Sequence, residues 1–158
     1  MSTHKSQSTA LFMILFAVAF LFTGCSGDDN KLDLSGSWSL EKATFAVGDK
    51  TDTLNDATGS LVFSDHDYQL TLNLTIGESQ FAEHMTKDES GECTVNSDYR
   101  NLGAVTAPNY WYGTIQFSPG IGGTWTTDFI CHDDPQGSLE LYGIPLNAGS
   151  LRLIWKRK

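Results

Sequence analysis

The sequence predicts an all-β protein, an antiparallel up-and-down barrel of eight to nine strands, with a β-sandwich as the alternative. Apolar and polar residues alternate with a period of two in several segments, and Gly, Asn, Asp and Pro separate nearly all of these segments. After residue 25, no segment of a dozen residues carries a helical stripe. Short strands at such close spacing are typical of barrels and sandwiches.

The clearest strand lies at residues 68–76, where apolar side chains occupy every second position from Tyr68 to Ile76. Residues 61–64 form its expected hairpin partner, and the polar residues 65–67 form the turn between them. Further strands are predicted at residues 37–46, 80–86, 92–96, 112–118, 124–131, 138–142 and 151–156.

The first segment of the chain has the pattern of a secretory signal. Lys5 precedes an uncharged apolar run at residues 10–22. As a helix this run would span roughly 20 Å, against the roughly 30 Å of a bilayer core, so a permanent transmembrane helix is the poorer interpretation.

A specific motif follows the apolar run. Leu21, Phe22, Thr23, Gly24 and Cys25 resemble the lipobox of bacterial lipoproteins. The resemblance implies a signal peptide at residues 1–24 and a lipidated Cys25. The small and acidic residues after it predict a flexible tether at 25–32, and the length and the alternating segments predict a single β-barrel domain at 33–158. The resemblance also implies anchoring in the cell envelope through lipid, at the outer membrane because serine follows the cysteine. The alternative is an ordinary cleaved signal peptide with a chance cysteine.

The charge of the remaining chain excludes one class of partner. Removal of residues 1–24 takes away one lysine and leaves nine basic and 19 acidic side chains. Such a surface repels phosphate backbones, so we expect no nucleic-acid binding. The basic residues 156–158 are interpreted as a solvated tail.

Two cysteines remain once Cys25 carries lipid. Because the envelope is oxidising, we expect Cys93 and Cys131 to form a disulfide, with two thiols or half of a metal site as the alternatives. In the chain-entropy model the disulfide would stabilise the fold by about 4 kcal/mol.

Three further motifs resemble those of the lipocalins. Gly36, Ser37 and Trp38 are similar to that family's Gly-x-Trp signature, and Arg152 lies where the family keeps an arginine that packs on the tryptophan. Residues 127–129, Thr-Asp-Phe, are similar to the family's Thr-Asp-Tyr turn motif. The resemblance spans roughly residues 34–157 and is closest to short lipocalin-like domains of bacterial lipoproteins. It implies barrel closure by Trp38 and Arg152, and a cup that holds a small apolar ligand.

Aromatic residues are the candidate ligand-binding side chains. Tyr110, Trp111 and Tyr112 follow the longest irregular connection, residues 99–109, which we predict to be a lid or a binding loop. Because consecutive strand residues alternate between faces, at least one of these rings should be exposed. Trp125 is the fourth candidate, and the alternative is that Tyr110 and Tyr112 cap the barrel core.

Catalytic and metal-binding residues are not predicted. The carboxylates and histidines at 65–67 and 132–134 fit turns better than metal sites. Adjacent strand residues Glu83 and His84 face opposite ways, so they cannot act together. No serine-elbow, zinc or phosphate-loop motif occurs, and no cofactor is expected.

We therefore expect a non-enzymatic, membrane-tethered barrel that binds a small apolar ligand, a glycan or an envelope component. One alternative is a protein-binding role similar to that of lysozyme inhibitors, and another is a carbohydrate-active or hydrolytic enzyme. A cavity of several hundred cubic ångströms, the usual scale of ligand pockets, would favour ligand binding. A packed interior would favour protein binding.

Overall fold

The computed structural model describes residues 32–77, 83–101, 109–133, 137–146 and 149–158, which all belong to one compact unit, Leu32–Lys158. The predicted signal peptide and the predicted lipidation site at Cys25 lie outside the described residues. Within the described ranges, no helix is long and apolar enough to cross a membrane.

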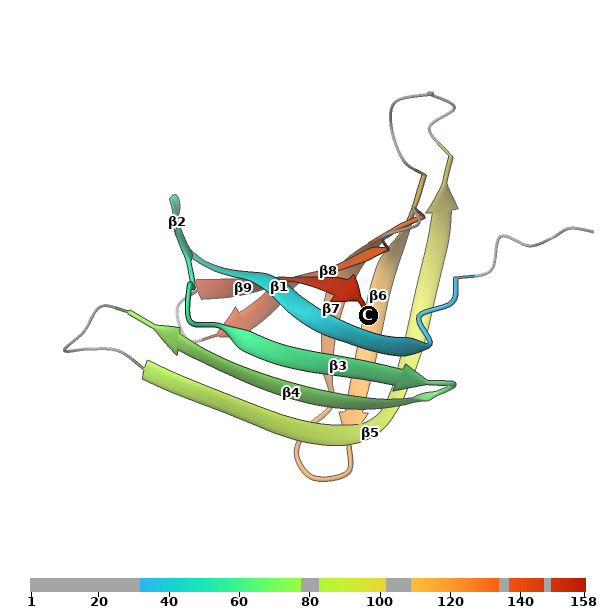
Figure 1. Cartoon of the computed structure of the whole chain (residues 1–158), viewed down its shortest axis with the longest axis horizontal. Helices are drawn as coiled ribbons and strands as arrows, with labels where there is room; N and C mark the ends of the chain where they lie inside the picture. Colours follow the sequence, from blue (N-terminus) through green and yellow to red (C-terminus); the bar gives the residue numbers. More distant parts are fainter. Residues whose placement is uncertain (1–31, 78–82, 102–108, 134–136, 147–148) are drawn as a thin grey trace, which may run out of the picture. The chain divides into compact units, whose positions relative to one another are not determined.

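The described residues form nine antiparallel strands (Figure 1). They are β1 (Gly36–Val47), β2 (Lys50–Thr53), β3 (Thr58–Ser64), β4 (Asp67–Ile76), β5 (Glu83–Arg100), β6 (Tyr110–Pro119), β7 (Trp125–His132), β8 (Ser138–Leu146) and β9 (Gly149–Arg157). From β3 to β9 each strand pairs with the next, and β1 pairs with both β3 and β9. The strands therefore close into a barrel, with β2 added at the edge of β1, and the predicted all-β antiparallel barrel is confirmed.

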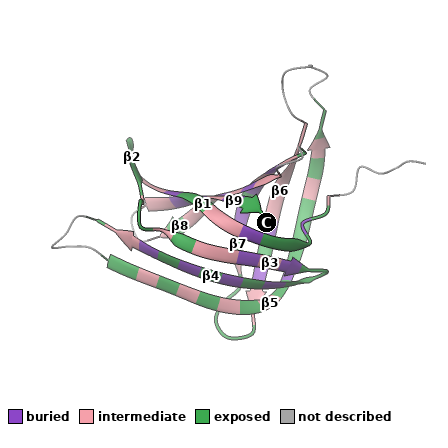
Figure 2. Cartoon of the chain, in the orientation of Figure 1, coloured by how far each residue is buried: buried purple, intermediate pink, exposed green. Residues whose placement is uncertain are grey.

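Buried residues alternate with more exposed ones along several strands (Figure 2), and the buried ones are the apolar residues of the core. On β4, for example, Leu70 and Leu72 are each 2% exposed, while Gln69 and Thr71 between them are exposed. Burial of one such large apolar side chain contributes about 1.5–3 kcal/mol to folding. The largest fully buried side chains are Trp38, Trp155, Phe117, Phe129, Leu61, Ile115, Leu139, Leu141, Leu151 and Leu153.

The β3–β4 hairpin is confirmed in the register that the alternation predicts. Phe63 pairs with Tyr68 and Ser64 with Asp67, which leaves Asp65 and His66 at the turn. Asp65 has a φ of 58°, a conformation that Asp tolerates better than most side chains. The geometry of the turn thus accounts for an Asp at this position.

Strand β5 is longer than the sequence suggested. The strands predicted at 80–86 and 92–96 form one continuous strand from residue 83, and residues 80–82 lie outside the described residues. Its first half pairs with β4 and its second half, from Gly91, pairs with β6. A β-carbon on Gly91 would clash with the carbonyl oxygen of Ser118, so glycine allows the close approach at this crossover.

Because β5 changes its partner, two strands have one edge without a hydrogen-bonded neighbour in this part of the barrel wall. In the described part of the chain, residues 83–89 of β5 pair with β4 alone, and residues 144–146 of β8 pair with β9 alone. A bulge in β8 between Leu141 and Ile144 accompanies the loss of pairing with β7.

Trp38 lies where β1 pairs with β9, and Arg157 is the arginine that packs on its ring. Trp38 is fully buried, and its Nε1 donates a hydrogen bond of 2.9 Å to the carbonyl oxygen of Leu34. The guanidinium of Arg157 lies 4.7 Å from the Trp38 ring and donates a hydrogen bond of 2.6 Å to the carbonyl oxygen of Asp33. Gly36 has a φ of 115°, which explains the glycine of the Gly-x-Trp motif.

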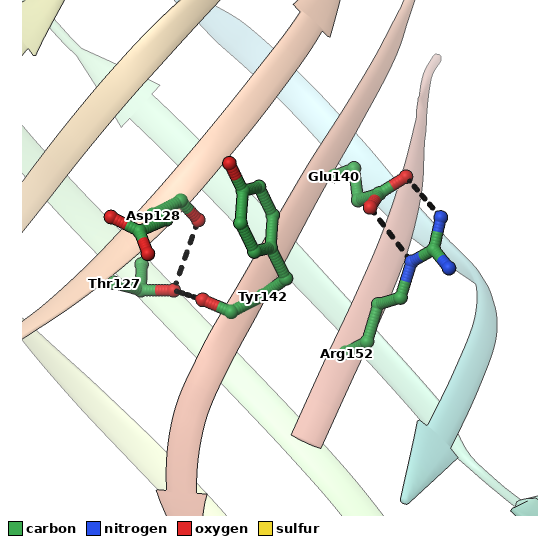
Figure 3. Close-up of polar contacts among 5 residues, drawn as sticks. All are labelled: Thr127, Asp128, Glu140, Tyr142 and Arg152. Atoms are coloured by element: carbon green, nitrogen blue, oxygen red, sulfur yellow. Dashed lines mark hydrogen bonds and ion pairs between the residues drawn. The ribbon is translucent and has the colours of Figure 1, made fainter. Parts of the chain in front are cut away.

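The assignment of Arg152 to barrel closure is wrong. Arg157 is paired with Trp38 across β1 and β9, whereas Arg152 is paired with Thr44 farther along the same two strands. Arg152 points outward and forms two contacts of 2.7 and 2.8 Å with the carboxylate of Glu140 on β8 (Figure 3). Arg157, which is paired directly with Trp38, is therefore the arginine that covers the indole.

The predicted disulfide is not formed, because Cys93 and Cys131 are two separate buried thiols. Cys93 pairs with Phe117 at one end of β6, and Cys131 pairs with Trp111 near the other end. These β6 positions lie roughly 20 Å apart along the strand. A disulfide needs Cα atoms within about 7 Å of each other, so the register forbids it.

A double-mutant cycle tests the closure contact. We expect Arg157→Ala and Trp38→Leu to show a coupling energy of about 0.5–1 kcal/mol in urea unfolding, since the cation packs on the indole face. Arg152→Ala is the matched control and should show no coupling with Trp38→Leu. Coupling of Arg152 instead of Arg157 would contradict this closure.

Candidate binding site

A cavity of about 100 Å³ lies inside the barrel beside the unpaired part of the wall. Met85 and Lys87 of β5 line it from one side, and Ile144, Pro145 and Leu146 of β8 line it from the other. Leucines of β3, β4, β8 and β9 with Phe117 and Trp125 complete the lining. Of the described residues that line this cavity, Lys87 alone is charged.

The bulge of β8 turns Ile144 towards this cavity, and a hydroxyl of β7 stabilises the bulge. Thr127 is buried, and its Oγ1 donates a hydrogen bond of 2.8 Å to the carbonyl oxygen of Tyr142 next to the bulge (Figure 3). The same Oγ1 lies 3.1 Å from the carbonyl oxygen of Asp128. The Thr-Asp-Phe motif is thus in the middle of β7, where it supports the neighbouring strand.

Glu89 lies at the centre of a polar cluster inside the barrel. Its Oε1 accepts hydrogen bonds from Nε1 of Trp125 at 2.9 Å and from the hydroxyl of Tyr68 at 3.0 Å. Its Oε2 lies 3.3 Å from Nζ of Lys87. The Glu89 side chain is only 13% exposed, so these three donors offset the desolvation of its charge.

Lys87 connects this cluster to the cavity. Its ammonium lies 4.0 Å from the centre of the Trp125 ring, a cation–π contact. Trp125 in turn stacks on Phe117, with ring centres 4.3 Å apart and an angle of 20° between the rings. The indole is therefore held at its N–H by Glu89 and on its faces by Phe117 and Lys87. The Lys87 side chain remains one third exposed.

The hydroxyl of Tyr68 is a permanent donor in this cluster. Burial is the main cause that raises the pKa of Tyr68, and its hydrogen bond to Glu89 is the next. The phenol therefore keeps its proton at physiological pH and continues to orient the carboxylate.

The structure separates the four predicted ligand-binding aromatics. Trp125 lines the cavity. Tyr110, Trp111 and Tyr112 lie at the start of β6, whereas the cavity residue Phe117 lies near its end, roughly 20 Å away along the strand. The group therefore does not form one site.

Tyr110 and Tyr112 form an outer-face cluster of their own with Arg100 and His132. The ring of Tyr110 lies 6.0 Å from that of Tyr112 and 6.2 Å from that of His132. Arg100 lies 5.7 Å from the Tyr112 ring and donates to the Tyr110 hydroxyl at 3.4 Å. Trp111 turns inward against the core. The two tyrosines thus neither cap the core nor stand fully exposed.

A second hollow, of about 380 Å³, lies over Val62, Ser64, Gln69 and Ser90. Its volume is larger, but these side chains alternate with buried neighbours and so belong to the outer face of β3, β4 and β5. It is a shallow surface depression, wide open to solvent. The cavity beside Trp125 is more enclosed, and it is the better candidate because it can remove part of a ligand from water.

The remaining polar candidates stay apart from the cavity. Asp65 and His66 are 3.9 Å apart and almost fully exposed, and Nδ1 of His84 hydrogen-bonds Thr75. Among the described residues, no three His, Cys, Asp or Glu side chains gather as a metal site would require. Most of the predicted lid, residues 102–108, and Asp134 lie outside the described residues.

Sequence reasoning missed Tyr68, Lys87 and Glu89 as site residues. The usable signal was the parity of β5, because Met85, Lys87 and Glu89 share one face with the buried Cys93. A lysine and a glutamate on the inner face of a strand indicate a polar pair inside the barrel.

Comparison with known proteins gives no relative: no family model matches the chain, and no significant match is found among curated proteins or solved structures. Barrels of this kind support many functions, so the side chains of the cavity have to indicate the ligand.

Proposed function

We propose that this chain is a lipid-anchored envelope protein whose lipocalin-like barrel binds the apolar end of a small ligand or envelope component, without catalysing a reaction. The observation that carries the proposal is the apolar cavity with Trp125 and Lys87 at its edge. Concave apolar sites with a few fixed polar groups are the usual form of small-molecule sites.

The size of the cavity limits what can enter it. A volume of about 100 Å³ is below the roughly 300–1,000 Å³ of ordinary ligand pockets. It is closer to the roughly 150 Å³ of a cavity that holds one benzene molecule. The proposed ligand therefore inserts a single ring or a short aliphatic chain and leaves its other end at the cavity edge.

The polar groups at the cavity suit orientation of a ligand better than proton transfer. Glu89 already accepts from Trp125 and Tyr68 and is paired with Lys87. A general base needs a lone pair that reaches the substrate, and this carboxylate directs its oxygens at protein donors. The proposal therefore assigns no catalytic residue, and the alternative of a carbohydrate-active or hydrolytic enzyme is less favoured.

A second candidate function is protein binding, as in lysozyme inhibitors. The mostly packed interior favours it, and so does the outer-face cluster of Tyr110, Tyr112, His132 and Arg100. Tyrosine and arginine are enriched in the energetic centres of protein interfaces. Ligand binding remains the first choice because Lys87 lines the cavity and its contacts with Glu89 and Trp125 hold the ammonium in position.

If the ligand binds in this cavity, a side chain that fills the cavity should weaken binding. Ile144→Phe should lower the affinity for hexan-1-ol at least severalfold, since the larger ring occupies the space that the hexyl chain needs. Ile154→Phe, on the outer face of β9, is the matched control and should leave the affinity unchanged. Titration calorimetry measures both, and equal affinity in the two variants would contradict binding in this cavity.

The anchor rests on the lipobox resemblance at Cys25 and is tested separately. We expect Cys25→Ser to move the protein from the membrane fraction to the soluble fraction, because stable anchoring requires the acyl chains. Immunoblots of fractionated cells measure this, with a Ser26→Ala variant as the control that should stay with membranes. A Cys25→Ser protein that still fractionates with membranes would show that the anchor is elsewhere.

A further inference from the structure

We infer that the ligand of this cavity carries a compact anionic head group, such as a carboxylate, which the ammonium of Lys87 binds at the cavity edge. This inference rests on the proposed ligand-binding function and adds the charge of the ligand to it. It depends on which hydrogen bonds Glu89 and Lys87 already make within the protein and which of their donors and acceptors are left for a ligand.

Glu89 is unsuited to bind a cationic or hydrogen-bond-donating head group. Its Oε1 accepts from both Trp125 and Tyr68, and its Oε2 faces Lys87. The side chain is 13% exposed, and the cavity lining does not include it. The lone pair that is left on Oε2 lies beside the ammonium of Lys87, which a cationic head group would meet as a like charge.

Lys87, in contrast, has binding capacity left. An ammonium has three N–H donors, and the described contacts direct it at Glu89 and at the face of Trp125. These two contacts hold the ammonium in position and leave a donor for a ligand. Because the side chain is one third exposed and lines the cavity, this donor lies where the polar end of an inserted ligand would be.

The rest of the cavity sets the preference between head groups. Its other lining side chains are apolar or aromatic, so a neutral head group finds no strong partner there. An ammonium head group would meet Lys87 as a like charge. A carboxylate or a similar anion would form a charge-assisted hydrogen bond, which is stronger than a neutral one.

Three probes with the same hexyl chain test the charge of the head group: hexanoate, hexan-1-ol and hexylammonium. Titration calorimetry is done on the Cys25→Ser protein, so that no lipid chain competes for the cavity. We expect hexanoate to bind about tenfold more tightly than hexan-1-ol, the value for a charged hydrogen bond at a partly exposed site. Hexylammonium should bind most weakly.

Variants of the two charged residues show which group is responsible. Lys87→Arg should keep the preference for hexanoate, and Lys42→Met, which removes an exposed lysine of β1, should keep it too. Lys87→Met should remove the preference and favour hexylammonium, because Glu89 then keeps its charge without a cation. If Lys87→Met does not fold, the double variant Lys87→Met with Glu89→Gln retains acceptors for Trp125 and Tyr68 and should bind hexanoate no better than hexan-1-ol.

The outcomes separate this inference from the function on which it rests. If hexan-1-ol binds as tightly as hexanoate, or if Lys87→Met keeps the preference, the anionic head group is wrong while the cavity proposal stands. If hexan-1-ol and hexanoate both fail to bind, the cavity proposal is wrong and the inference fails with it.

Discussion

The pairing of β1 with β9 is the constraint on which the rest of the structure depends. It closes the sheet, places Trp38 and Trp155 in the interior, and brings Arg157 over the Trp38 indole. Closure pairs most of the sheet edge that would otherwise be exposed and invite association. The cavity lies where this closed wall is weakest, because β5 has crossed from β4 to β6 and β8 has left β7 at its bulge.

The polar cluster of Glu89, Lys87, Trp125 and Tyr68 stands out in a barrel interior that is mostly apolar. Burying an ion pair, even in part, costs desolvation of the charges, and well-packed apolar residues often stabilise a core as well or better. Glu89 nevertheless receives three donors, and it orients both the indole of Trp125 and the ammonium of Lys87. An ammonium fixed beside an apolar cavity is an arrangement that a ligand can use.

The barrel could be predicted from the sequence because the alternation of apolar and polar residues can be seen within each single strand. The β3–β4 hairpin, in which Phe63 pairs with Tyr68, is an example. The site could not be predicted in the same way, because it depends on which strands lie next to each other in the barrel. Counting cysteines suggested a disulfide, but strand register places Cys93 and Cys131 far apart. Dividing β5 into two strands left residues 87–91 as a connection and hid the inward direction of Lys87. The resemblance assigned the closure contact to Arg152, but Arg157 is the arginine that pairs with Trp38.

The most direct test of the account is the position of a bound probe. Nuclear Overhauser contacts from the methyl group of hexanoate should reach the side chains of Ile144 and Leu146, and the methylene next to its carboxylate should lie near Trp125 and Lys87. Contacts from the probe to Tyr110 or Tyr112 instead would place the ligand at the opposite end of β6 and contradict the account.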